Sequence, residues 1–259
     1  MATLVSFHAH PDDEAIACGG TLARAAAEGH RVVVVFGTRG ERGEVVEGFL
    51  TPNEALWERR VDETYEAARI VGAHRVEFLG YTDSGMMGEE TNDDPECFWQ
   101  ADQEEAAARL AAILDGERCD VLTIYDEIGN YGHPDHIQVH RVGVRAAELA
   151  GPPVVYEATM NRDYFTELMQ SWGEAPPASD DDAQFGFPDE VITTRVDVRP
   201  YLDLKRKAMA AHASQVADTS FFLAQPADRF EALWGTEWFI RRGAAPGFRS
   251  TWLFEDSQS

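Results

Sequence analysis

Two short segments of the chain place histidines and aspartates around a proline. The first is His8-Ala9-His10-Pro11-Asp12-Asp13-Glu14, and the second is Tyr131-Gly132-His133-Pro134-Asp135-His136. Proline restricts the backbone and favours a turn, so the neighbouring side chains are presented together. Two imidazoles and one carboxylate are a typical ligand set for a catalytic Zn²⁺ that keeps a position open for water. Neither segment contains cysteine, so the pattern indicates a catalytic rather than a structural zinc site.

The adjacent aspartates of the first segment suggest a division of labour. The side chains of Asp12 and Asp13 cannot point the same way, because they are neighbours in the chain. We expect one of them to bind the metal and the other to take a proton from water. A histidine that is not needed as a ligand could act as a general acid or stabilise an oxyanion.

The elements that must position these segments alternate along the first part of the chain. Strands are predicted at 3–7, 31–36, 74–79, 119–124 and 154–156, and helices at 15–28, 53–71, 102–115 and 136–149. The run at 31–36 is almost pure valine, as expected for a parallel strand that is buried on both faces. The alternation predicts an α/β fold with a doubly wound, mostly parallel sheet in the order 3-2-1-4-5 and helices on both faces.

That strand order brings the two segments together. The first segment follows the first predicted strand, and the second comes shortly after the fourth. Strands one and four are neighbours at the point where the chain reverses direction, and ligands bind there outside the carboxyl ends of the strands. Residues about 120 positions apart are therefore expected to share one crevice.

The second half of the chain has a weaker pattern. A strand is predicted near 191–196 and a helix near 201–212, followed by an aromatic-rich part. No second-domain boundary is evident, so we expect a single domain over residues 1–259. Within it, residues 161–190 are expected to form a variable loop or lid that shapes the substrate pocket.

Charge and composition exclude several classes of partner. The 259 residues include 46 acidic and 22 basic ones, which gives a net charge of −24. Such a chain is repelled by the phosphates of nucleic acids and by anionic lipid head groups. No apolar run is long enough for a transmembrane helix, and the N-terminus does not resemble a signal peptide. The three cysteines are predicted to be reduced thiols of a cytoplasmic protein, and a homo-oligomer is compatible with the sequence.

Both segments resemble the motifs of the LmbE-like, or PIG-L, family of zinc-dependent N-deacetylases. That family carries A-H-P-D-D-E after its first strand and H-P-D-H after its fourth, and both motifs are intact here. The resemblance also includes the segments Gly40-Glu41-Arg42-Gly43-Glu44, Arg60-x-x-Glu63, Asp83-Ser84-Gly85-Met86 and His212-Ala213-Ser214-Gln215. The chain looks most similar to actinobacterial mycothiol-pathway deacetylases and amidases, and the resemblance implies a Rossmann-like fold.

The resemblance implies a metal site and a base. His10, Asp13 and His136 would be the ligands of one zinc ion. Asp12 would be the general base. Fe²⁺ is an alternative to Zn²⁺, because a His/His/Asp site does not discriminate strongly between these ions.

The resemblance also implies roles for residues around the metal. His133 would be a protonated donor or acid that Asp135 orients. Tyr131 would stabilise the oxyanion. Arg60 would hold sugar hydroxyls beside Asp83.

These expectations favour a metal-dependent hydrolase that removes an acetyl group from an N-acetylglucosamine-type amino sugar or glycoconjugate. An amidase that cleaves a mycothiol S-conjugate or another amide with the same site is the nearest alternative. A sugar-binding protein that has lost catalysis is an alternative of another class, and the complete ligand set and intact base argue against it. A metallophosphoesterase would more often need ligands for a second metal, which the sequence does not supply.

Overall fold

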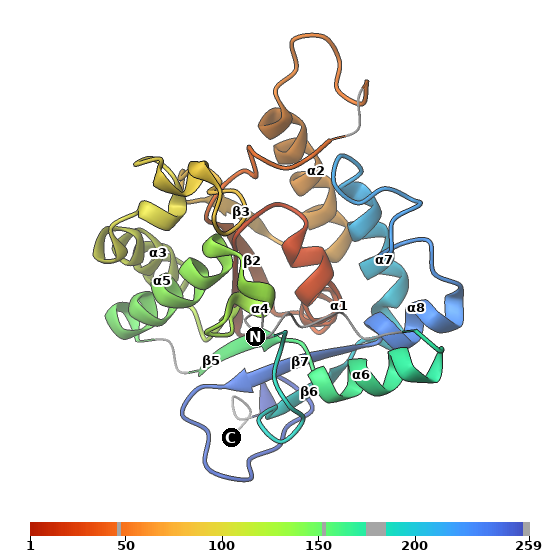
Figure 1. Ribbon diagram of the computed structural model, residues 1–259. Helices are drawn as coiled ribbons and strands as arrows, with labels where there is room; N and C mark the ends of the chain where they lie inside the picture. Colours follow the sequence, from red (N-terminus) through yellow and green to blue (C-terminus); the bar gives the residue numbers. More distant parts are fainter. Residues whose placement is uncertain (46–47, 152–153, 175–184, 256–259) are drawn as a thin grey trace.

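The computed structural model describes residues 1–45, 48–151, 154–174 and 185–255, and its centre is one seven-stranded sheet (Figure 1). The strand order is β3-β2-β1-β4-β5-β7-β6. The strands are β1 (Thr3–His8), β2 (Arg31–Phe36), β3 (Arg75–Phe78), β4 (Val121–Tyr125), β5 (Val154–Thr159), β6 (Thr194–Asp197) and β7 (Thr236–Arg241). The predicted order 3-2-1-4-5 is confirmed, and β7 and β6 extend the sheet beyond β5.

The central strands are parallel and buried. β1 pairs in parallel with both β2 and β4, and β3 and β5 continue the parallel part on either side. Every residue of β1 and β4 is buried, as expected for parallel strands that are covered on both faces. β7 is antiparallel to β5 and to β6. The carboxyl ends of β1 and β4 therefore lie at the same edge of the sheet.

Helices cover both faces of the sheet. α1, α2 and α7 pack together, whereas α3 and α5 pack together on the opposite side (Figure 1). The helices are α1 (Asp13–Ala27), α2 (Leu56–Val71), α3 (Gln103–Glu117), α4 (Gly129–Gly132), α5 (Pro134–Ala150), α6 (Arg162–Ser171), α7 (Leu202–Ala211) and α8 (Ala227–Trp234). Short 3₁₀ helices lie at Glu90–Asp93, Phe98–Gln100 and Arg199–Tyr201. Among the described helices, none has the length and apolar character needed to cross a membrane.

The segment 161–190, which is expected to form a variable loop or lid, begins with a helix. Its first part forms α6, which begins where the Asn161 side chain accepts a hydrogen bond from the Tyr164 amide and which buries Phe165 and Met169. An amphipathic helix of this kind forms when its apolar side chains pack on the rest of the fold. Residues 175–184 of the expected lid lie outside the described part of the chain.

α7 is anchored to the sheet by a buried ion pair. Lys205 Nζ donates to Glu237 Oε1 on β7 over 2.6 Å, and both side chains are almost fully buried. The Glu237 carboxylate also accepts the amides of Gly20 and Thr21 on α1, over 2.9 and 2.8 Å. These bonds hold α7 against α1, and the C-terminal end of α7 leads to His212.

Candidate active site

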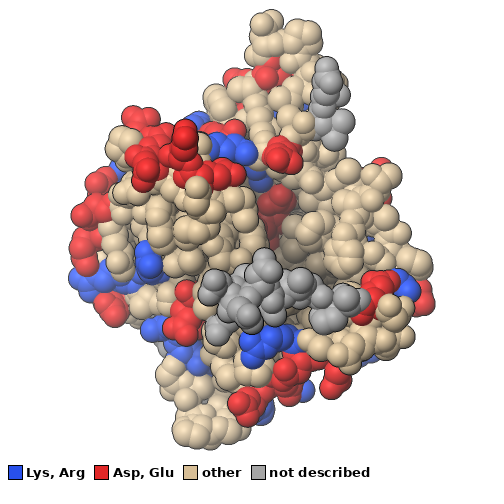
Figure 2. All heavy atoms as spheres, viewed as in Figure 1, with Lys and Arg blue, Asp and Glu red and all other residues tan. Residues whose placement is uncertain are grey.

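The two His/Asp segments meet at the carboxyl edge of the sheet, as predicted. One connects β1 to α1, and the other leads through α4 into α5. Together they line a cavity of about 840 Å³, which is in the usual size range of small-molecule sites. The face shown in Figure 2 is hollowed near its centre, and acidic atoms lie within the hollow. His10, Asp12, Asp13, His133 and His136 all contribute to the lining.

Asp13 lies between two imidazoles. Its Oδ2 is 3.4 Å from His10 Nδ1 and 3.3 Å from His136 Nε2, and it accepts the His10 amide over 2.8 Å. Burial by itself raises the pKa of Asp13, but the His136 and His10 imidazoles outweigh burial and hold this pKa well below its ordinary value. The carboxylate is therefore ionised, as a metal ligand has to be.

The donors at this position suit one divalent cation. The buried residues His10, His133 and His136 each offer a nitrogen, and these atoms lie within 4.8 Å of one another. Imidazole nitrogen with carboxylate oxygen is a donor set for Zn²⁺ or Fe²⁺. The set implied by the resemblance takes His10 and His136 from this group and adds Asp13. A second buried group of His10, Asp83 and Asp135 meets the same distance criterion.

Asp12 has an unusual backbone and a perturbed carboxyl group. It precedes α1 with a φ of 108°, in the region that non-glycine residues rarely adopt. Burial raises the pKa of Asp12 to about 6, although the Arg60 guanidinium lowers it. A carboxylate with a pKa closer to neutrality is a better general base than an ordinary aspartate.

Arg60 braces the Asp12 loop. Its Nη1 donates to the Gly40 carbonyl over 2.9 Å, its Nη2 donates to the Pro11 carbonyl over 2.5 Å, and Nη2 is 3.4 Å from Asp12 Oδ2. The side chain lines the cavity but is buried. Both Nη1 and Nη2 thus bind the protein, and contact of Arg60 with sugar hydroxyls stays a prediction.

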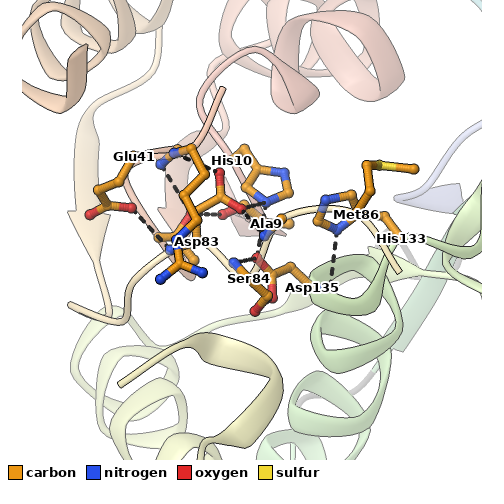
Figure 3. A network of polar contacts seen from close by, with 12 residues as sticks. Ala9, His10, Glu41, Asp83, Ser84, Met86, His133 and Asp135 are labelled. Atoms are coloured by element: carbon orange, nitrogen blue, oxygen red, sulfur yellow. Dashed lines mark hydrogen bonds and ion pairs between the residues drawn. The ribbon is translucent and has the colours of Figure 1, made fainter. Parts of the chain in front are cut away.

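Asp135 orients His133 through its backbone, not through its carboxylate. The Asp135 amide donates to His133 Nδ1 over 3.1 Å, in the cap of α5. The Asp135 carboxylate instead accepts hydrogen bonds from the Ser84 amide over 2.9 Å, from the Ser84 hydroxyl, and from His10 Nε2 over 3.1 Å (Figure 3). The carboxylate thus positions His10, and only the amide positions His133.

The surroundings of His133 disfavour the protonated form that the resemblance implies. Burial and the nearby His10 and His136 rings lower the pKa of His133 to about 2. A neutral imidazole carries one proton, and Nδ1 is occupied as an acceptor, so the proton is on Nε2. His133 can therefore donate a hydrogen bond from Nε2 without being an imidazolium.

Tyr131 and Asp83 lie at the same site. The Tyr131 hydroxyl is 3.5 Å from His136 Nε2, and burial and the Asp13 carboxylate raise its pKa, so it stays protonated. Asp83 Oδ1 is 3.6 Å from His10 Nε2, and its carboxylate accepts the amides of Gly85 and Arg42 over 2.9 and 3.3 Å. Both side chains line the cavity, where a substrate can reach them.

Comparison with known proteins agrees with this geometry. Residues 5–147 match the family described as PIG-L, GlcNAc-PI de-N-acetylase. The chain belongs to the PIG-L family. A 1D-myo-inositol 2-acetamido-2-deoxy-alpha-D-glucopyranoside deacetylase of Thermobifida fusca (strain YX) is 43% identical, with 83% of each chain covered. A protein of the same name from Acidothermus cellulolyticus is 42% identical over 95% of this chain and 90% of its own.

The fold of this PIG-L protein is also that of solved structures. N,N'-diacetylchitobiose deacetylase from Pyrococcus horikoshii superimposes with a TM-score of 0.62 at 22% identity, covering 95% of this chain and 84% of its own. At this identity the likeness concerns the fold alone. It agrees with the mixed, mostly parallel sheet described above.

Several polar residues of this PIG-L site were not assigned a role from the sequence. Ser84 binds the Asp135 carboxylate, and His212 lies 2.6 Å from a carboxylate oxygen of Glu14. Both residues lie in segments that resemble the family. This resemblance is the sequence feature that could have identified them as site residues. Beneath the site, His8 Nδ1 is 2.8 Å from the Tyr125 hydroxyl, and the Tyr125 ring stacks on His136 with 4.6 Å between the ring centroids.

Proposed function

We propose that this PIG-L protein is a zinc-dependent deacetylase that removes the acetyl group of 1D-myo-inositol 2-acetamido-2-deoxy-alpha-D-glucopyranoside. The observation that carries the proposal is the placement of Asp13 between two imidazoles, 3.4 and 3.3 Å away, with Asp12 beside it in one cavity. The names of the relatives from Thermobifida fusca and Acidothermus cellulolyticus supply the substrate. Fe²⁺ is an alternative ion for the same ligands.

Different residues of the chain have different roles in amide hydrolysis. A divalent ion held by His10, Asp13 and His136 would act as a Lewis acid on the amide carbonyl and activate water. The Asp12 carboxylate accepts a proton from the attacking water. The proton then passes to the leaving nitrogen as the C–N bond breaks, so that acetate and a free amine are formed.

The charge that develops on the carbonyl oxygen needs donors. The His133 Nε2–H and the Tyr131 hydroxyl are proposed to donate hydrogen bonds to it. Neither group has to change its protonation state for this task. Asp83 is proposed to bind a sugar hydroxyl, since its carboxylate lines the cavity.

The cytoplasm is the proposed location. The three cysteines, Cys18, Cys97 and Cys119, are all free thiols, which supports a reducing compartment.

The proposal is tested by product analysis with the purified zinc-loaded protein. We expect equal amounts of acetate and free amine from the inositol glycoside, measured by mass spectrometry. Asp12→Asn is the matched control, because it keeps the size of the side chain but cannot accept the proton. Absence of acetate release from zinc-loaded protein would refute the proposed reaction.

An amidase acting on a mycothiol S-conjugate is the second candidate, and one observation favours it. Part of the cavity lining is apolar and comes from Phe165, Met169, Phe222, Leu233 and Trp234. Inositol is too polar to gain from contact with these apolar side chains. An apolar substituent on the sulfur of an S-conjugate would bury apolar surface against them. Parallel measurement of kcat/KM on an S-conjugate and on the inositol glycoside decides between the two substrates.

A further inference from the structure

A hydrogen-bonded pair, one member of which comes from a distant part of the chain, helps to hold the backbone of Asp12 in its unusual conformation. A non-glycine residue at a φ of 108° is strained and persists only where its surroundings hold it. The Asp12 side chain makes no capping hydrogen bond to α1. Its amide, however, donates to Glu14 Oε2 over 3.0 Å. The Glu14 carboxylate is therefore one of the groups that keep the loop in this shape.

Glu14 is in turn fixed by a residue from the other end of the chain. Its second oxygen, Oε1, lies 2.6 Å from Nε2 of His212, which is 198 positions away in the sequence. Both side chains are almost fully buried, at 2% and 0% exposure. His212 follows α7, which packs against α1 and α2. An unbroken chain of hydrogen bonds thus leads from α7 through Glu14 to the amide of Asp12.

We propose that Glu14 and His212 are positioning residues, which hold the Asp12 carboxylate in the orientation that it needs to accept a proton. This inference rests on the proposed role of Asp12 as the base. Glu14 and His212 do not themselves line the cavity, so they act through Asp12 rather than on the substrate. A change of about 1 Å in the position of a reacting group can cost roughly 100-fold in rate, so loss of the pair should reduce turnover.

Variants at His212 test the proposal. We expect His212→Leu to lower kcat by about 10- to 100-fold, with zinc content and KM close to those of the wild type. His212→Gln should recover most of this loss, because its terminal amide can still donate to Glu14. His212→Asn is too short to reach Glu14 and should resemble His212→Leu, so it replaces that variant if the latter does not fold.

Glu157→Gln is the matched control. Glu157 is also a buried carboxylate, paired with Arg242 over 2.5 Å, but it lies outside the cavity lining. Its substitution should lower the stability to urea without changing kcat. An equal loss of kcat in Glu157→Gln and in His212→Leu would show that any weakened buried pair has this effect, and it would overturn the proposal.

Combination with Asp12→Asn separates this inference from the proposed function. If the pair acts through Asp12, His212→Leu lowers kcat no further in the Asp12→Asn background. A full additional loss in the double variant, or unchanged turnover in both His212→Leu and His212→Asn, would overturn the positioning role while leaving the base assignment intact. Near-normal turnover in Asp12→Asn alone would instead refute the proposed function.

Discussion

Nδ1 of His133 accepts a hydrogen bond from the backbone amide of Asp135 over 3.1 Å. This bond fixes the tautomer of the ring, because the single proton of a neutral imidazole must then be on Nε2. Burial and the His10 and His136 rings keep the pKa of His133 low, at about 2. These surroundings therefore favour a neutral ring that donates from Nε2.

His133→Ala is expected to lower kcat by about 10²- to 10³-fold, the usual effect of removing one donor to an oxyanion. His133→Gln should retain part of the activity, because its amide can place an N–H near the position of Nε2. The protonation state is measured directly by ¹⁵N NMR of the histidines, in the metal-free and the zinc-loaded protein. An imidazolium signal from His133 at pH 6 would contradict the assignment.

Asparagine substitutions of the two adjacent aspartates should lower activity for different reasons. Asp12→Asn is expected to retain zinc and to bind substrate, with kcat lowered by about 10²- to 10⁴-fold, because a positioned base is lost. Asp13→Asn should lose zinc affinity, with activity partly restored by excess Zn²⁺. Metal content and kcat are measured on both variants. Loss of zinc in Asp12→Asn with retention in Asp13→Asn would mean that the two roles are exchanged.

The pH dependence of kcat/KM should report Asp12. Because burial raises the pKa of Asp12 to about 6, its carboxylate form, which is the active base, is lost as the pH falls through this value. The acidic limb of the profile is therefore expected above the range of an ordinary aspartate, and it should vanish in Asp12→Asn. Arg60→Gln removes a positive charge that lowers this pKa, so it should move the limb to higher pH. A limb that persists unchanged in Asp12→Asn would assign it to another group.

Substitution by alanine should change the stability of the protein in opposite directions at two helical glycines. At Gly20 in α1, an added Cβ would lie 2.4 Å from the Cβ of Val198, so Gly20→Ala should cost about 1–3 kcal/mol through overpacking. At Gly116 in α3 an added Cβ meets nothing within 4 Å, so Gly116→Ala should stabilise the protein by about 0.5–1 kcal/mol. Urea unfolding of both variants measures these changes. Equal effects at the two positions would show that close packing against Val198 does not decide the outcome.

The parallel half of the sheet could be predicted because its signals are local. Buried strands such as β2 are continuous apolar runs, and helices separate them. The antiparallel edge was only partly predicted. β6 has four residues, of which two are exposed, and β7 alternates buried and half-buried positions. Strands of this kind are set by the neighbours on which they pack, and those neighbours are remote in the sequence.

The same division holds at the site. Sequence alone determined which side chains meet there, because each motif follows a predicted strand and the topology brings the strand ends together. Tertiary structure decided what those side chains do to one another: it directs Arg60 to backbone carbonyls, lowers the pKa of His133 and brings His212 within 2.6 Å of Glu14. Protonation and orientation depend on burial and on charges from distant elements. A local motif contains neither, so these properties exist only in the folded chain.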